Sequence, residues 1–253
     1  MSEPKVSSLA KALRVLDCFS VEEPELGVTE IAEKLGIGKS NAHNIISTYC
    51  QTGYLQQMPN RKYSLGYRLL EHAFIINQHL GYPHAVYDLL LEAAERTGQV
   101  VYFGIPYETD VLYLYVAHPI ARMKELPYRE ICGERAPLCT TGIGKAILAN
   151  LPPEEWLSRI PETVPAHTPQ TITDTAQILQ ELRATRERGF SIDNCEHEAN
   201  VRCAGVPVYN ARGRLVAGIS SSGPAPVMTD RKLQECADIL LDITQRIRER
   251  LYA

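Results

Sequence analysis

The chain has 253 residues, with 26 Lys and Arg against 30 Asp and Glu, and seven cysteines. This length predicts two domains of ordinary size, each able to bury a core without disulfides or metals. An odd number of cysteines without a Cys-x-x-Cys pair argues against a disulfide framework, and no apolar run approaches the roughly 18 residues of a membrane span. Because the first residues also lack an apolar signal core, we expect a soluble, cytoplasmic protein.

The first 53 residues predict three helices. Apolar residues at helical spacing indicate a helix over residues 7–18 and a short second one starting at Val28, with Thr29 as its cap. A turn at residues 36–38 leads to a third helix over residues 39–52, closed by Gly53. Its first turn and outer face carry five polar side chains: Lys39, Ser40, Asn41, His43 and Asn44. The second helix of a helix-turn-helix presents such side chains to base edges in the major groove.

A hairpin follows this helix pair. Residues 54–57 and 62–65 predict two strands around a turn, which would form a wing. Residues 36–70 carry four basic side chains and no acidic one, whereas five Glu residues lie between positions 22 and 33. Any amphipathic helix leaves polar residues outside, so the prediction of DNA binding depends on the cationic hairpin beside it. We expect base contacts from Ser40, Asn41, His43 and Asn44, and phosphate contacts from Lys39, Arg61 and Lys62.

The rest of the chain predicts a second, larger domain. A helix over residues 67–80 is interrupted by Gly81-Tyr82-Pro83, so we divide the chain into a winged helix-turn-helix (1–66), a linker helix (67–81) and a second domain (82–253). Within the last we expect helices at 84–96, 141–150, 154–160, 174–188 and 229–252, and strands at 100–105, 111–116, 191–193, 201–209 and 215–221. Hairpins without strict βαβ alternation predict the α+β class.

Several segments resemble the IclR family of bacterial transcriptional regulators. They are IAEKLGIGKS (31–40), GYL (53–55), PLCTTGIGKA (137–146), and residues 189–196, 201–208 and 218–223. The resemblance covers nearly the whole chain. It implies a DNA-binding regulator without catalytic activity or cofactor, whose C-terminal domain is GAF-like (profilin-like), α/β/α with an antiparallel sheet, and which forms a homodimer or homotetramer. The family often has Arg at the position of Asn44 and His at that of Cys139. The operator sequence and the ligand of a relative therefore cannot be transferred to this chain.

The resemblance also implies an effector site. Val201, Cys203 and Gly205 share one strand face, and Ser220 and Ser222 share another. In relatives with a bound carboxylate, a helix start corresponding to Thr141, Gly142 and Ile143 supplies backbone N–H groups. Completing the expected site are Asp193, Val201, Cys203, Ser220 and Ser222, with Met123 and Leu126 as a roof.

Asp193 and the two serines decide the effector class that we expect. A carboxylate at Asp193 would repel an anion, so we expect Asp193 to accept a hydrogen bond from a ligand hydroxyl, which favours a hydroxy, keto or sugar acid. The alternatives are a solvated strand face for the serines and a turn role for Asp193. Effector binding would change operator affinity by shifting two DNA-binding heads.

Other patterns are weaker. Residues 142–145 are not a nucleotide-binding loop, because Cys139 and Ala146 replace the required Gly and Ser or Thr. Ser220 lacks a Gly-x-Ser-x-Gly elbow. The rival interpretation is a metal- or redox-sensing regulator, or a thiol enzyme on the GAF-like domain, built from Cys139, Cys195, His197 and Cys203. The sequence leaves effector identity and the choice between repressor and activator open.

Overall fold

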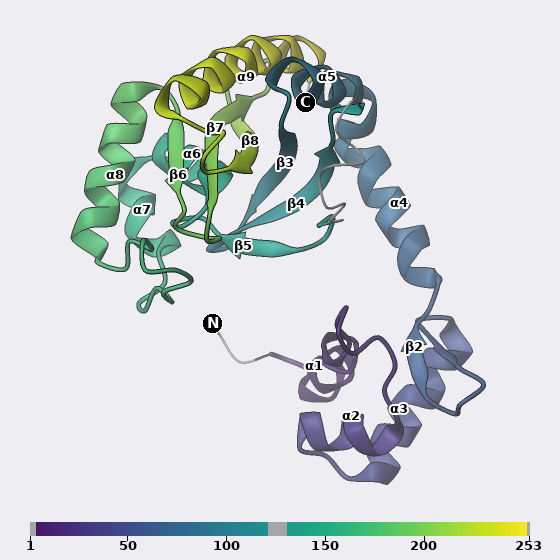
Figure 1. The fold of residues 1–253 in the computed structure, drawn as a ribbon. Helices are drawn as coiled ribbons and strands as arrows, with labels where there is room; N and C mark the ends of the chain where they lie inside the picture. Colours follow the sequence, from purple (N-terminus) through teal and green to yellow (C-terminus); the bar gives the residue numbers. More distant parts are fainter. Residues whose placement is uncertain (1–3, 121–130, 252–253) are drawn as a thin grey trace. The chain divides into compact units, whose positions relative to one another are not determined.

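The computed structural model describes residues 4–120 and 131–251. The chain divides into two compact units, Met1–Leu80 and Gly81–Ala253 (Figure 1). In the described parts, no helix combines the length and the apolar character that crossing a membrane demands.

The N-terminal unit is a winged helix. It contains α1 (Ser7–Leu13), a 3-10 turn (Leu16–Cys18), α2 (Val28–Leu35), α3 (Lys39–Thr52), β1 (Leu55–Gln57), β2 (Tyr63–Leu65) and α4 (Arg68–Leu80). Strands β1 and β2 pair antiparallel, and Leu26 bridges to Tyr63. The core of this unit consists mainly of Val15, Leu26, Ile31, Ala42, Ile46 and Leu55.

Two local expectations for this unit are wrong. The helix predicted over residues 7–18 ends at Leu13, and a separate 3-10 turn follows the fully buried Val15. The cap of α2 is Gly27 and not Thr29: the Glu30 carboxylate accepts a hydrogen bond from the Gly27 N–H, at the start of a helix whose first residue is Val28, as predicted.

The C-terminal unit is built on a six-stranded antiparallel sheet in the order β5-β4-β3-β8-β7-β6. The strands are β3 (Val100–Tyr107), β4 (Asp110–Ala117), β5 (Arg135–Pro137), β6 (Ser191–Asn194), β7 (Val201–Tyr209) and β8 (Leu215–Pro224). The predicted α+β class with an antiparallel sheet is thereby confirmed. Strand β5 was not expected, because its three residues, Pro137 included, show no alternation.

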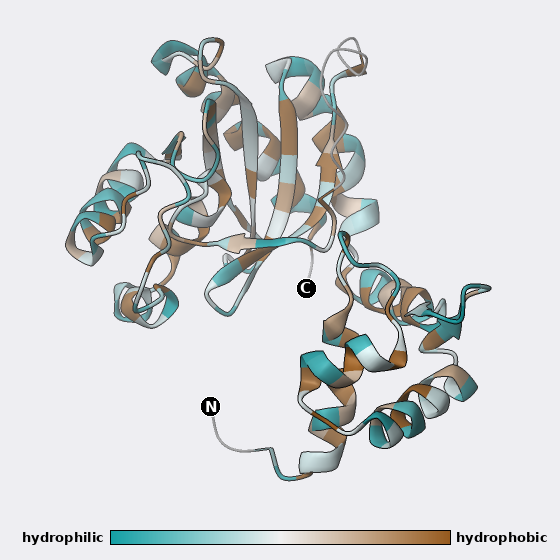
Figure 2. Ribbon diagram, turned by 60° about the horizontal axis from the view of Figure 1, so that its bottom comes forward, coloured by the Kyte–Doolittle hydropathy of each residue, from teal (hydrophilic) through white to brown (hydrophobic). Residues whose placement is uncertain are grey.

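Helices cover both faces of this sheet. Helices α5 (Tyr82–Thr97) and α9 (Asp230–Arg250) lie side by side on one face, and α6 (Gly142–Asn150), α7 (Pro153–Arg159) and α8 (Thr175–Arg188) lie toward the other (Figure 1). Hydrophobic stretches run along the central strands (Figure 2). Helix α6 is buried over almost its whole length between the sheet and α8. Its N-terminal end therefore meets the sheet inside the domain.

Candidate functional site

The first turn of α3 presents a polar surface. Gly38 precedes the helix in an extended conformation, and Ala42 and Ile46 anchor the helix in the core. Ile45 packs against the same core, whereas all five predicted DNA-contacting residues of this helix are exposed: Lys39, Ser40, Asn41, His43 and Asn44. The geometry is the one that entry into a major groove requires.

The wing carries an exposed cation at its tip. Arg61 has φ 64° in the turn between β1 and β2 and is exposed. Lys62 is less exposed, and its Nζ lies 3.1 Å from Oε1 of Glu30 on α2. Asn60 donates to the Glu25 carboxylate at 2.7 Å. These two contacts tie the wing to the segment around α2 and leave Arg61 pointing outward.

A cavity of about 250 Å³ lies in the C-terminal unit, where the start of α6 faces β3, β7 and β8. Strand pairing brings its walls together, because Cys203 is paired with Ser222 and Gly205 with Ser220. The other edge of β8 pairs Ser220 with Tyr102 and Ser222 with Val100 on β3. The predicted residues that line it are Thr141, Gly142, Ile143, Asp193, Val201, Cys203, Ser220 and Ser222. Met123 and Leu126 lie outside the described residues.

The start of α6 is held close to β7. Thr141 caps the helix by accepting a hydrogen bond from the Gly144 N–H at 3.1 Å. A Cβ on Gly142 would lie 2.9 Å from the Cβ of Cys203, so only glycine allows this approach. The first N–H groups of a helix have no partner within it, and the helix dipole favours an anion beside them. The N–H groups of Gly142 and Ile143 therefore make this end of the cavity suited to an anion.

Asp193 and Cys203 lie beside this helix start. The backbone N–H of Glu196 donates to Oδ1 of Asp193 at 2.7 Å, and the Cys203 thiol lies 3.8 Å from Oδ2. Ser222 donates to the Cys203 sulfur at 2.9 Å. Asp193 is only 3% exposed, and burial raises its pKa to about 6. It thus has both a turn role, through Oδ1, and a position in the cavity wall.

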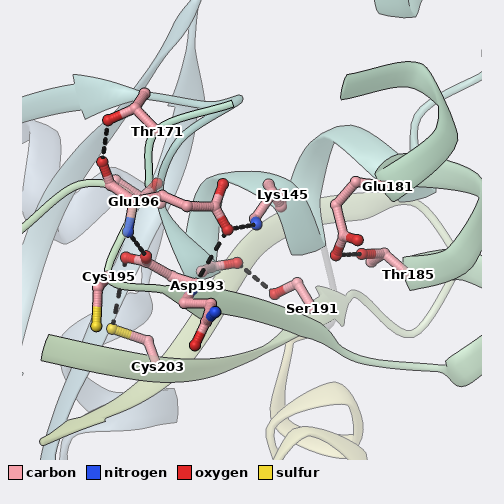
Figure 3. Close-up of polar contacts among 12 residues, drawn as sticks. Lys145, Thr171, Glu181, Thr185, Ser191, Asp193, Cys195, Glu196 and Cys203 are labelled. Atoms are coloured by element: carbon pink, nitrogen blue, oxygen red, sulfur yellow. Dashed lines mark hydrogen bonds and ion pairs between the residues drawn. The ribbon is translucent and has the colours of Figure 1, made fainter. Parts of the chain in front are cut away.

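An ion pair is buried beneath the cavity. Nζ of Lys145 on α6 lies 2.6 Å from Oε1 of Glu196, and these side chains are 1% and 5% exposed (Figure 3). The Ser191 hydroxyl donates to the Gly142 carbonyl, which joins β6 to α6. Lys145 is therefore occupied within the core, in contrast to the lysine of a phosphate-binding loop.

Sequence reasoning missed part of the cavity wall. Val100 and Tyr102 line it from β3, and alternation along that strand could have indicated them. Tyr113 reaches the cavity from β4, where its ring meets that of Tyr102 edge to face at 5.8 Å. Only the strand pairing reveals this contact. The remaining lining residues include Ile131, Glu134, Arg135, Ala136, His197 and Glu198.

Cys139 and Cys203 are poorly suited to be the reactive thiols that the redox interpretation requires. Burial raises the pKa of Cys139 to about 11 and that of Cys203 well above its usual value. Both are therefore neutral thiols near pH 7, whereas a reactive cysteine is a thiolate there. Cys139 lies in the core cluster that contains Leu138 and Ile143. Within residues 4–120 and 131–251, no group of three or more His, Cys, Asp or Glu side chains has the arrangement of a metal site.

Comparison with known proteins gives matches over nearly the whole chain. Residues 80–249 match the family model described as bacterial transcriptional regulator IclR C-terminal, and residues 8–59 match the IclR helix-turn-helix domain. The HTH-type transcriptional regulator XynR of Escherichia coli is 32% identical over 233 residues, which cover 91% of each protein.

Two solved structures illustrate the likeness in fold. The IclR of Thermotoga maritima superposes with a TM-score of 0.75 at 29% identity, over 98% of this chain and 99% of that one. An IclR homolog from Microbacterium hydrocarbonoxydans, complexed with 4-hydroxybenzoate, gives a TM-score of 0.81 at 21% identity, over 96% and 99% of the two chains.

Proposed function

Because the chain belongs to the IclR family of bacterial transcriptional regulators, we propose that a small carboxylate, bound in the cavity at the start of α6, controls its binding to DNA. The protein is a helix-turn-helix transcriptional regulator, in a family whose named members are regulators and not enzymes. The cavity carries the proposal, because the N–H groups of a buried helix start, hydroxyl groups and an apolar wall converge there.

The polar and apolar groups of the cavity favour a small carboxylic acid. Ser220, Ser222 and the α6 N–H groups can donate to carboxylate oxygens, as charge-assisted hydrogen bonds. Val201, Ile143 and Tyr113 provide an apolar remainder. The 4-hydroxybenzoate complex of a family member is compatible with this class, and hydroxy, keto and sugar acids are the candidates for this chain.

For the DNA interface we propose two sets of contacts. Ser40, Asn41, His43 and Asn44 would contact bases, and Lys39, Arg61 and Lys62 would contact phosphates. Exposure of the α3 face and of Arg61 supports this assignment. To contact a phosphate, Lys62 would have to leave its ion pair with Glu30 and take the phosphate as its anionic partner.

We further propose that α4 pairs with a second copy of the chain. It buries none of its residues in the monomer, and five large apolar or aromatic side chains along or next to it are more than half exposed: Tyr67, Leu70, Phe74, Ile75 and Ile76. Exposed apolar side chains gathered on one helix mark an interaction surface. Helix α4 is fixed to the winged helix by Tyr54, whose OH lies 2.8 Å from Nε2 of His72 with the rings stacked. A homodimer, or a dimer of dimers, would then carry paired DNA-binding heads whose spacing the effector changes.

Calorimetry tests the effector proposal. Wild-type protein is titrated with pyruvate, D-galacturonate and 4-hydroxybenzoate, and Ser220→Ala/Ser222→Ala is titrated with whichever acid binds. Each serine lost should weaken binding about tenfold or more, because a hydrogen bond to a charged group is worth about 1.5–3 kcal/mol. Ser47→Ala, which changes a serine of α3 in the N-terminal unit, is the control. Unchanged affinity in the double variant would exclude the cavity as the site.

A further inference from the structure

Asp193 shares one end of the cavity with the proposed carboxylate site. It pairs with Cys203 across β6 and β7, and a Cβ on Gly142 would lie 3.6 Å from the Cβ of Asp193. A ligand carboxylate at the N–H groups of Gly142 and Ile143 would therefore lie next to the Asp193 carboxyl group. Two carboxylates in contact cannot both remain ionised in a buried site.

The surroundings of Asp193 provide little compensation for its charge. The titratable and charged groups around it are Tyr113 on β4, Lys145 on α6, Cys203 on β7, and Glu196, His197 and Glu198 after β6. Arg135 lines the same cavity from β5, but its guanidinium is paired with Asp110 at 2.6 Å. The charge of Lys145 lowers the pKa of Asp193, but its ammonium group is paired with Glu196 at 2.6 Å. Hydrogen bonds from backbone N–H groups oppose the effect of burial only in part, and the pKa of Asp193 is raised to about 6.

We propose that Asp193 is a specificity-determining residue. When the effector binds, Asp193 is a neutral carboxylic acid that donates a hydrogen bond to the effector carboxylate, so one proton is taken up on binding. The inference rests on the proposed function. Oδ1 already accepts from the Glu196 N–H, so the proton goes from solvent to Oδ2, which faces Cys203. The effector keeps its negative charge and no covalent bond other than this O–H forms. Acids should bind more tightly than their neutral amide or ester analogues, because an uncharged acceptor forms a weaker hydrogen bond with the Asp193 O–H.

The proposal predicts a steep pH dependence. With a pKa of about 6, about half of the free protein carries the proton at pH 6 and about 1% does at pH 8, so affinity should fall about 50-fold between them. At pH 7 binding should take up about 0.9 proton per site. The carboxyl groups of the three probe acids ionise well below pH 6 and do not contribute.

Calorimetry of the wild-type protein at pH 7, in phosphate and in Tris buffer, measures the proton uptake without any variant. The probe is whichever of pyruvate, D-galacturonate or 4-hydroxybenzoate binds. Asp193→Asn keeps an acceptor for the Glu196 N–H and a donor toward the ligand, so its affinity should be nearly constant from pH 6 to 8. Equal observed binding enthalpies in the two buffers, after subtraction of the heats of dilution, would mean that no proton is taken up. That result would overturn the proposal while leaving the effector site intact.

Two matched variants separate Asp193 from its neighbours. His197→Gln removes the imidazole that lines the cavity, and Glu198→Gln removes an exposed carboxylate at the same cavity. Both should retain the 50-fold pH dependence, whatever their absolute affinity. Loss of the dependence in His197→Gln together with its persistence in Asp193→Asn would assign the proton to histidine and overturn the proposal. Failure of all three acids to bind the wild-type protein would instead reject the proposed function, and this inference with it.

Discussion

The two units place their candidate functional residues in opposite settings. On α3, Asn41 and His43 are exposed, and the core of the N-terminal unit is made by other side chains. In the C-terminal unit, Gly142 and Asp193 line the cavity and also hold α6 and the turn after β6 in place. Substitutions on α3 should therefore change function alone, whereas substitutions at the cavity should change function and stability together. The predictions that follow test this contrast.

The largest effect is expected from Lys145→Ala. It leaves the Glu196 carboxylate buried without its cation, which should lower the free energy of unfolding by about 3–5 kcal/mol. Urea denaturation measures this. Replacing both partners, Lys145→Met with Glu196→Met, should restore much of the stability because no charge stays buried. A loss in the single variant as small as that of an exposed lysine such as Lys39→Ala would erase the contrast between the units.

Asp193→Asn should act in the opposite direction. The pKa of Asp193 is about 6 in the folded protein against 3.8 ordinarily, so the folded state favours the protonated form. Its contribution to stability is therefore present at low pH and is lost as the pH rises from about 4 to about 6. The Asn variant should be more stable than wild type by about 3 kcal/mol at pH 8 and by little at pH 4. Urea midpoints at the two pH values check this, and a gain of equal size at both would show that charge is not the cause.

Gly142→Ala sharpens the comparison by steric means. Its Cβ would press on Cys203, and separating α6 from β7 should cost about 1–3 kcal/mol of stability while weakening effector binding. Gly38→Ala is the control, because a Cβ there meets nothing within 4 Å. Thermal unfolding of the two variants provides the comparison. Equal melting temperatures would mean that the helix start tolerates a side chain.

How much the sequence predicted also differs between settings. Strand β7 was predicted with its observed bounds, because residues 201–209 are a mostly apolar run that ends at a turn-like segment, residues 210–213. The prediction of the α2 cap was wrong, because it relied on a Ser or Thr hydroxyl as the capping group. The observed contact is made by the Glu30 carboxylate, which reaches back to the Gly27 N–H. Cavity residues on β6 to β8 came from resemblance, but Tyr113 depends on sheet register, which no local pattern encodes. Likewise, the burial that raises the pKa of Asp193 is a property of the packed domain and of no local sequence pattern.

Substitutions at the DNA interface should leave stability within about 0.5 kcal/mol of wild type. Asn41→Ala should cost about 1–3 kcal/mol of binding to a selected DNA site, and Arg61→Ala should weaken binding to all sequences and reduce the salt slope by about one. Fluorescence anisotropy at several salt concentrations measures both. Lys34→Ala, which removes a cation of α2 that is paired with Glu23, should leave the slope unchanged. Unchanged DNA affinity in both Asn41→Ala and Arg61→Ala would reject the interface.

The claim that the cavity controls DNA binding has one direct test. DNA selected from a random pool is titrated with wild-type protein and with Ser220→Ala/Ser222→Ala, each with and without the acid that binds wild type. We expect the acid to change wild-type DNA affinity at least several-fold, and the double variant to bind DNA normally but to ignore the acid at the same concentration. A double variant that responds to the acid as wild type does would contradict the account.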